Sequence, residues 1–277
     1  MDRLLFVNMT KNRKISSFLL LLLCAMCYSQ IAFNVEYEAD YKLNYKLSSK
    51  ENAPTYETTF ALLIGKQESY FKNMNQYVAD SLTLSKKLFE TSNVQNDIVN
   101  YSKYQNDFPE NIGMTNSKIY VSLGIKRKNF KYEELNNTEW KLVNEYKKIG
   151  NLNCQKAITT KYGRKWVAFF SEDIPFQYGP YKFGNLPGLI IELFDNKKDY
   201  HFIMYSFKKR KYICKSANMY TNAELVGKSK IFNYKKNIKT NPNRFDAFID
   251  DVETLRKLRM KSMELVKYYN PIELEIE

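Results

Sequence analysis

The sequence is poor in the residues and motifs on which most known catalytic and metal sites depend. Its 277 residues include one histidine, His201, and four cysteines, a set too small to supply a usual zinc site. No Gly-x-Ser-x-Gly elbow, P-loop, Gly-x-Gly-x-x-Gly or His-Glu-x-x-His motif is present. His201 falls in an expected strand, where a structural imidazole is favoured over a catalytic base. The sequence therefore predicts no catalytic residue, metal or cofactor, and an enzyme with an unrecognised site is the less favoured alternative.

Long apolar runs are also lacking, and no segment reaches the about 18 residues that a transmembrane helix needs. Residues 1–29 instead have the three parts of a signal peptide: basic residues at 11–14, an apolar core at 18–26 and a polar end. We expect cleavage before Gln30, which exports residues 30–277 to the periplasm or the cell surface. Met9 is an alternative start to Met1.

The cysteines divide into two pairs. Cys24 and Cys27 lie in the signal, where acylation of either is an alternative that Leu23 and Met26 disfavour, because a small residue usually stands before a lipidated cysteine. Cys154 and Cys214 stay in the exported chain, and an even pair there is a candidate disulfide. Closing a loop of about 60 residues contributes about 4 kcal/mol in the chain-entropy model. Two unpaired buried thiols are the alternative.

Charge gives a weak indication of partners. The net charge is +13, and removing four basic residues and one acidic residue with the signal leaves 39 against 29, or +10. The lysines are scattered among asparagines and tyrosines instead of forming one long basic run, and export separates the chain from most nucleic acid. Nucleic-acid binding is therefore not expected, although basic proteins in general attract polyanions.

Hydrophobic periodicity predicts a mainly β fold. Every odd position from Ile31 to Leu47 is apolar or aromatic and nearly every even one is polar, which is typical of a long antiparallel strand with one buried face. Nine further strands are expected at residues 56–64, 68–72, 117–123, 130–134, 140–146, 154–162, 165–171, 189–194 and 200–207. Together they predict a single curved antiparallel sheet or half-barrel meander, in one domain.

Helical signals are fewer. Residues 75–90 are expected to form a short helix or a loop. Apolar residues recur at helical spacing from Phe245 to Leu258 behind start signals at Asn241-Pro242 or Asn243. This pattern predicts a C-terminal helix near residues 243–268 that packs on the sheet. A basic amphipathic helix lying on a membrane or a partner is the alternative.

Residues 173–193 are the most specified stretch, with three prolines, three glycines and four aromatic residues. Leu186-Pro187-Gly188-Leu189 fits a type II turn, in which Gly188 would take the positive φ, and Leu189, Ile190 and the residues after them read as a buried strand. The stretch resembles the signature of the GLPGLI family (Porph_ging domain) of Bacteroidota, with Asn185 in place of its first glycine. Asparagine also tolerates a positive φ. The family has no established activity, so the resemblance implies no reaction.

The resemblance covers most of the exported chain, including residues 149–193 and Asn270-Pro271-Ile272-Glu273-Leu274, and is weakest at residues 91–137 and 209–245. Next to the signature, Glu172 and Asp173 are adjacent, and adjacent strand residues face opposite sides, which suits a pair of cooperating carboxylates poorly. The aromatic residues are more suggestive. Either they cover the end of the sheet, or they line a groove for an apolar ligand, peptide or glycan; the groove candidates are Arg164, Trp166, Phe176, Tyr178, Tyr181 and Phe183.

The function predicted from these features is an exported, non-catalytic binding or carrier module for an apolar ligand, a peptide or an envelope partner. A structural or interaction protein that associates with an outer-membrane receptor is the alternative.

Overall fold

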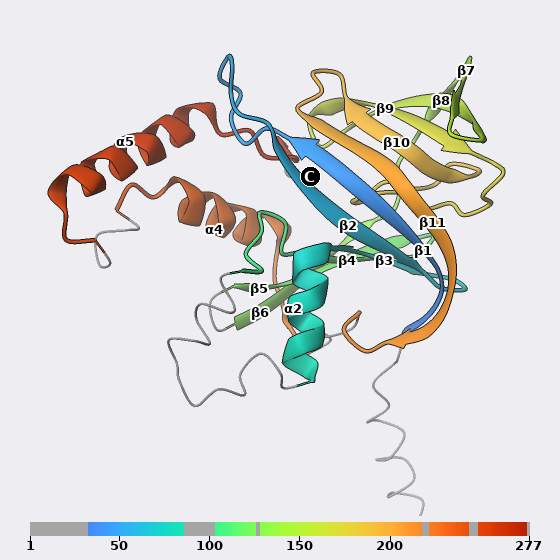
Figure 1. The fold of residues 1–277 in the computed structure, drawn as a ribbon, viewed down its shortest axis with the longest axis horizontal. Helices are drawn as coiled ribbons and strands as arrows, with labels where there is room; N and C mark the ends of the chain where they lie inside the picture. Colours follow the sequence, from blue (N-terminus) through green and yellow to red (C-terminus); the bar gives the residue numbers. More distant parts are fainter. Residues whose placement is uncertain (1–32, 86–102, 126–127, 218–221, 244–248, 276–277) are drawn as a thin grey trace, which may run out of the picture.

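The computed structural model describes residues 33–85, 103–125, 128–217, 222–243 and 249–275. In this part of the chain twelve strands form one sheet, in the order β12-β6-β5-β4-β3-β2-β1-β11-β10-β9-β8-β7. All neighbouring strands are antiparallel except the short β12, which is parallel to β6. The prediction of a mainly β fold built on a single curved sheet with a C-terminal helix is confirmed (Figure 1). The expected signal peptide lies outside the described residues.

The strands are β1 (Phe33–Tyr45), β2 (Tyr56–Ile64), β3 (Ser69–Asn73), β4 (Asn111–Met114), β5 (Lys118–Ile125), β6 (Lys128–Leu135), β7 (Lys141–Ile149), β8 (Leu152–Lys161), β9 (Arg164–Ser171), β10 (Leu189–Asp195), β11 (Tyr200–Cys214) and β12 (Glu224–Leu225). The helices are α2 (Met74–Leu84), α4 (Lys228–Thr240) and α5 (Val252–Tyr268).

Three long strands, β1, β2 and β11, form the curved back of the half-barrel, with β7–β10 as one arm and β3–β6 as the other (Figure 1). The predicted alternation of β1 is present, since Ala39, Tyr41 and Leu43 are fully buried in the main core. Register shifts between β1 and β11 interrupt their pairing after Val35 and after Asp40. Such irregularities increase strand twist, which accounts for the strong bend of these two strands.

Each of the nine further predicted strands overlaps an observed one, and two strands were missed. Strand β4 has four buried residues and contains Gly113. Its side chains therefore do not alternate clearly between polar and apolar, and only one of them is β-branched, so the sequence signal for a strand is weak. Strand β12 has only two residues. Strand β11 continues past its predicted end at Phe207 to Cys214, because Lys208, Lys209 and then Tyr212–Cys214 pair with β1, although residues 208–211 are charged and exposed.

The C-terminal helix starts later than the sequence predicted, and a second helix precedes it. Helix α5 begins at Val252, where the side chain of Asp251 accepts a hydrogen bond from the backbone N–H of Thr254 at 2.7 Å. The expected start near residue 243 is therefore wrong; residues 244–248 lie outside the described part. Helix α4 was missed because Gly227 provides no side-chain cap and its first turn has no acidic residue.

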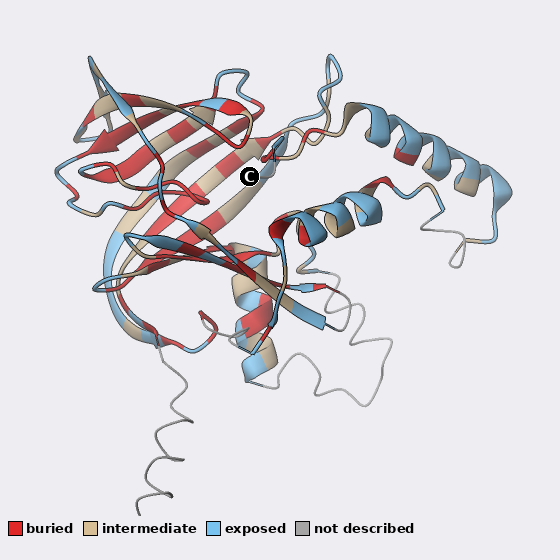
Figure 2. Cartoon of the chain, turned by 180° about the vertical axis from the view of Figure 1, so that it is seen from behind, coloured by how far each residue is buried: buried red, intermediate tan, exposed pale blue. Residues whose placement is uncertain are grey.

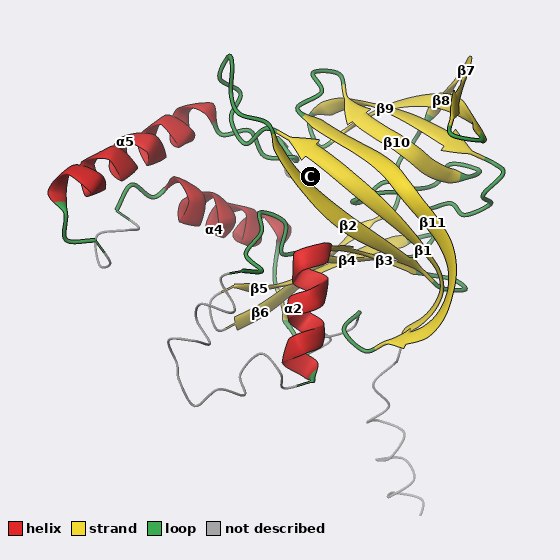
Figure 3. Ribbon diagram, in the orientation of Figure 1, coloured by secondary structure: helices red, strands yellow, loops and turns green. Residues whose placement is uncertain are grey.

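Helix α4, and not α5, packs against the main core. Ile231 is 2% exposed, and Phe232 and Tyr234 pack against the same core. Helix α5 lies beside α4 and is mostly exposed, with Ser262 as its buried residue (Figures 2 and 3). No helix in the described ranges is long and apolar enough to cross a membrane.

Candidate functional site

The signature segment between β9 and β10 fills the interior of the half-barrel. Phe183 is fully buried, and its ring centroid lies 4.7 Å from that of Trp166 on β9. On the opposite arm, the Lys182 ammonium donates to the Tyr132 hydroxyl of β6 at 2.8 Å. The Tyr41 hydroxyl of the curved back donates to the Ile190 carbonyl at 2.6 Å. The segment therefore joins both arms to the back of the sheet.

The six groove candidates do not form one groove. Arg164, Trp166, Tyr178, Tyr181 and Phe183 are buried, and Phe176 is half-buried against Tyr37 and Phe207. Two of the six still border open space. Trp166 lines a cleft beside β7, and Tyr181 lines a separate pocket, called here the pocket below α4, whose walls include residues 232–239 of α4 and residues 269–274. Most of these side chains are therefore part of the hydrophobic core.

Arg164 fastens the C-terminal segment to the sheet. Its guanidinium donates to Asp195 Oδ2 and to the Ile272 carbonyl, both at 3.0 Å, and to Asn270 Oδ1 and the Pro271 carbonyl, both at 2.6 Å. The planar fork of an arginine suits such multiple acceptors. With 4% exposure, this guanidinium has its donors turned inward, toward the protein.

Three buried charged residues and the half-buried Glu134 hold the signature in place. Lys182 Nζ lies 2.6 Å from both Glu134 and Glu273, and Lys228 Nζ lies 2.8 Å and 2.9 Å from the same two carboxylates. Burial would raise the pKa of Glu134, but Lys182 and Lys228 more than offset this effect and hold its pKa below the usual value. Burial would lower the pKa of Lys182, but Glu273 and Glu134 raise it above the usual value. Glu134 and Lys182 are therefore charged at neutral pH.

The signature turn differs from the prediction in one respect. Gly188 does not have a positive φ, so the type II turn predicted there is wrong. Its requirement for glycine is steric, because a Cβ atom would lie 2.0 Å from the Ser171 carbonyl oxygen. Asn185 does have a positive φ, of 64°, and its side-chain amide donates to the Asn136 carbonyl at 2.8 Å. Pro187 is exposed, whereas Leu186, Leu189 and Ile190 are at most 1% exposed.

The two cysteines of the exported region are free and buried, so the predicted disulfide is absent and the alternative of two thiols is observed. Cys154 lies on β8 in the main core, and Cys214 lies at the end of β11 in a second, smaller core with Phe33, Leu63 and Ala217. Burial raises the pKa of the Cys154 thiol to about 11.

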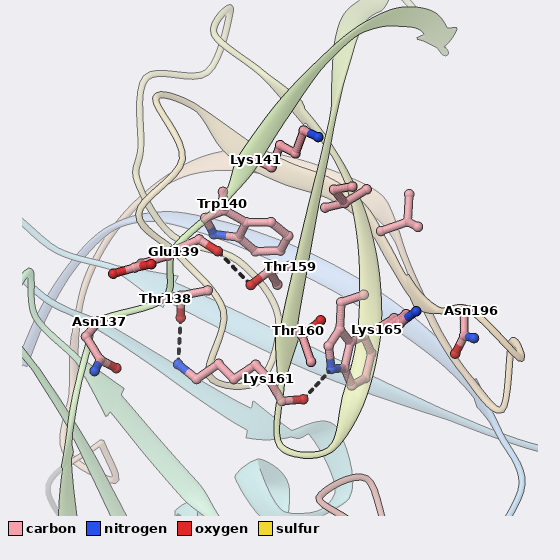
Figure 4. Close-up of a pocket in the computed structure, with 13 residues that line it drawn as sticks. Asn137, Thr138, Glu139, Trp140, Lys141, Thr159, Thr160, Lys161, Lys165 and Asn196 are labelled. Carbon is pink, nitrogen blue, oxygen red and sulfur yellow. Dashed lines mark hydrogen bonds between the residues drawn. The ribbon is translucent and has the colours of Figure 1, made fainter.

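An open cleft of about 890 Å³ lies where the start of β7 passes the β8–β9 hairpin (Figure 4). Trp140 and Trp166, the two tryptophans of the chain, both line it. Trp166 is fully buried, while the Trp140 ring is half-buried and its Nε1–H donates to the Gly184 carbonyl at 2.7 Å. The signature backbone therefore fixes the orientation of the Trp140 ring.

Polar groups surround the two indoles. Thr159 Oγ1 donates to the Glu139 carbonyl at 2.6 Å, and Lys161 Nζ donates to Thr138 Oγ1 at 2.6 Å (Figure 4). The exposed side chains of Glu139, Lys141, Thr160, Lys165 and Asn196 also line the cleft. This mixture suits a ligand that has both an apolar group and polar groups. Sequence reasoning selected Trp166 but not Trp140, because only the fold brings residues 137–141 beside residues 158–167.

Strand β7 continues from the cleft along an edge of the sheet. It is the last strand of the order and pairs only with β8 in the described part of the chain. Its side chains include Leu142 and Tyr146, which are 49% and 54% exposed. An edge strand presents unpaired backbone N–H and C=O groups to another extended chain.

The remaining polar candidates are away from this cleft. His201 Nε2 lies 2.8 Å from Glu192 Oε1, and Lys147 also binds Glu192. Partial burial would raise the pKa of Glu192, but these two partners hold it below the usual value. The pair lies on the face of the sheet opposite Leu193 and Phe202 and lines neither the cleft nor the pocket below α4. Glu172 is exposed, and Asp173 accepts a hydrogen bond from Ser171 at 3.1 Å.

No group of three or more His, Cys, Asp or Glu residues within the described ranges is arranged to hold a metal ion.

Comparison with known proteins gives weak similarities. No protein-family model and no curated protein matches the chain. Two crystal forms of PNGF-II match with TM-scores of 0.49 and 0.48, at 17% and 16% identity, over 72% and 82% of this chain. The chain spans about a third of the length of PNGF-II (32% and 33%). A LolA superfamily protein from Nitrosomonas europaea gives a TM-score of 0.27 at 8% identity, over 64% of this chain and 87% of its own. Scores this low do not establish a shared function.

Proposed function

We propose that the protein is an exported, non-catalytic binding module of the GLPGLI type that binds an extended peptide segment of a cell-envelope partner. The observation that carries this proposal is that both tryptophans line one open cleft at the start of β7, an edge strand. In this proposal residues 1–29 direct export, and the partner is met in the periplasm or at the cell surface.

The peptide would add a strand to β7, using the unpaired backbone groups of that edge. One of its apolar side chains would lie against the Trp140 ring, whose orientation is fixed by the hydrogen bond to Gly184. Lys141 and Lys165 are exposed at the cleft, and they favour acidic side chains on the peptide. Backbone pairing supplies affinity in this mode of recognition, and the cleft supplies specificity.

A carrier of an apolar ligand is less well supported. Such a ligand needs an enclosed apolar cavity, and the interior of the half-barrel is filled by Tyr178, Tyr181 and Phe183 of the signature. The lining of the open cleft, by contrast, is largely polar.

The proposal is tested by measuring binding of the exported chain to an array of eight-residue peptides in which apolar and acidic residues alternate. We expect the parent to select a subset of them and Lys165→Glu to weaken these at least tenfold, because the charge that faces the acidic side chains is reversed. Trp140→Phe, which keeps a ring but loses the Nε1–H donor, should weaken them less. Tyr120→Ala on β5 is the control, since Tyr120 is 40% exposed on the other arm. Equal binding by the parent and Lys165→Glu would contradict the proposal.

A further inference from the structure

A second cavity, of about 280 Å³, lies below α4 and is separate from the Trp140 cleft, because no residue lines both. Its walls come from α4, from residues 107–110 and from the C-terminal residues 269–274. Aromatic residues make up half of its apolar lining, namely Phe108, Tyr181, Tyr200, Phe232 and Tyr269. The volume is near the lower end of the range for small-molecule sites, about 300 Å³.

Three carboxylates line this pocket, and two of them are fully engaged. Asp107 accepts hydrogen bonds from the Tyr45 hydroxyl at 2.8 Å and from Lys239 at 3.0 Å. One oxygen of Glu273 accepts from Tyr181 and Lys182, and the other forms an ion pair with Lys228 at 2.9 Å. Every oxygen of these two carboxylates therefore has a cationic or hydroxyl partner, although Glu273 Oε2 meets Lys228 as an ion pair and not as a hydrogen bond.

Glu110 is different. Its side chain is 9% exposed, and Oε1 accepts from Lys235. Oε2 is buried and has no hydrogen-bond partner in the part of the chain that the structure describes. Leaving a buried charged oxygen without a donor costs free energy. The pocket thus contains a carboxylate oxygen that has neither a hydrogen bond nor an ion pair with any described residue, beside a wall with several aromatic residues.

The geometry points to a small-molecule site that takes a neutral ligand with an apolar body and one hydroxyl or amide N–H group, which donates to Glu110 Oε2. The aromatic walls suit the apolar body, and the single free acceptor suits one donor. A cationic ligand fits less well, because Lys235 and Lys239 already pair with Glu110 and Asp107, Lys182 and Lys228 pair with Glu273, and Lys236 also lines the pocket.

This inference is tested with two probes of the same shape, benzyl alcohol and toluene, by titration followed in two-dimensional NMR spectra of the exported chain. We expect benzyl alcohol to bind the parent at least tenfold more tightly than toluene and to shift resonances of residues that line the pocket. Glu110→Met keeps the side-chain length and removes the acceptor, so the preference for the alcohol should disappear while toluene still binds. Glu110→Gln retains one acceptor oxygen and should show an intermediate preference.

A blocking variant tests the location without changing Glu110. Asn233 is exposed on α4 and lines the pocket, so Asn233→Trp should abolish binding of both probes. Asn237→Trp, at an exposed position of the same helix outside the lining, should leave both unchanged. If the parent binds neither probe, binds both equally, or keeps its preference in Glu110→Met, the inference is wrong. None of these results bears on peptide binding at the Trp140 cleft.

Discussion

The carbonyl oxygen of Ser171 lies 2.0 Å from the position that a Cβ atom on Gly188 would occupy. Non-bonded atoms cannot approach so closely, and the obstacle is backbone at the end of β9, which cannot rotate away as a side chain can. The signature therefore needs glycine at this position so that the segment before β10 can pass directly against β9.

Gly188→Asn separates this steric requirement from a conformational one. Asparagine tolerates a positive φ, so it would be accepted if the backbone angle were the reason for glycine. We expect it instead to destabilise the protein by about 3 kcal/mol, the upper range for overpacking, measured by urea unfolding. Gly150→Asn is the matched control, because Gly150 has a φ of 59° and nothing within 4 Å of its Cβ position. A Gly188→Asn variant as stable as Gly150→Asn would contradict the steric explanation.

Arg164→Lys should release the C-terminal segment while conserving the charge. A lysine can replace only part of the four hydrogen bonds that the guanidinium makes to Asp195, Asn270, Pro271 and Ile272. We expect a loss of about 3 kcal/mol, since breaking a buried ion pair typically costs about 3 to 5 kcal/mol, together with faster proteolysis near residue 270. Arg210→Lys, at an exposed ion pair with Glu38, should change stability by less than about 0.5 kcal/mol. Unchanged proteolysis in Arg164→Lys would argue against the fastening role.

The strands were predictable from the sequence because their signal is local. In β1 the alternation of side chains alone indicates which residues face the core, and β2 was predicted with its observed ends. The positive φ of Asn185 was likewise predictable, because asparagine tolerates this backbone conformation better than most residues do. Strand β4 and helix α4 were missed because their local signals are weak, and tertiary contacts of Ile112 and Ile231 with the core decide their structure.

The candidate site was less accessible to sequence reasoning. Trp140 and Trp166 meet in one cleft only because β7 and β9 flank β8, a relation that no spacing in the chain indicates. Lys182 and Glu134 are likewise far apart in sequence, so nothing local marked that lysine as buried. Composition selected the correct segment, residues 173–193, but could not distinguish a core-filling role for its aromatic residues from a ligand-lining one.

The buried charges predict how stability depends on pH. The pKa of Glu134 is lowered in the folded protein, so its contribution is present above the unfolded value, about 4.3, and is lost as the pH falls through the folded pKa. The pKa of Lys182 is raised, so its contribution is present below about 10.4 and is lost as the pH rises through the folded pKa. Urea unfolding should therefore show a loss of stability below about pH 4 and above about pH 10.5.

Glu134→Gln identifies the group behind the acid limb. It removes the titrating carboxylate and leaves Lys182 and Lys228 with one acceptor fewer, so the variant should be less stable at pH 7 and should lose less on acidification than the parent. Glu133→Gln, at the exposed pair with Lys118, should keep the parent profile. An acid limb of the same slope in Glu134→Gln and the parent would assign it to other carboxylates.

The cysteines should behave as two unreactive thiols. Burial limits access to both, and at pH 8 the raised pKa of Cys154, about 11, leaves little thiolate for alkylation. Iodoacetamide added to the native, unreduced exported chain should therefore label neither residue within minutes. The same reagent added after denaturation, still without reductant, should label both Cys154 and Cys214, because the structure has no bond between them. Intact-mass analysis counts the labels, and an unlabelled denatured chain would mean that a disulfide forms after all.

Cys214→Ser gives an independent check, since losing a disulfide would typically cost about 2 to 5 kcal/mol, whereas replacing a free thiol by a hydroxyl should cost less, about 1 to 2 kcal/mol.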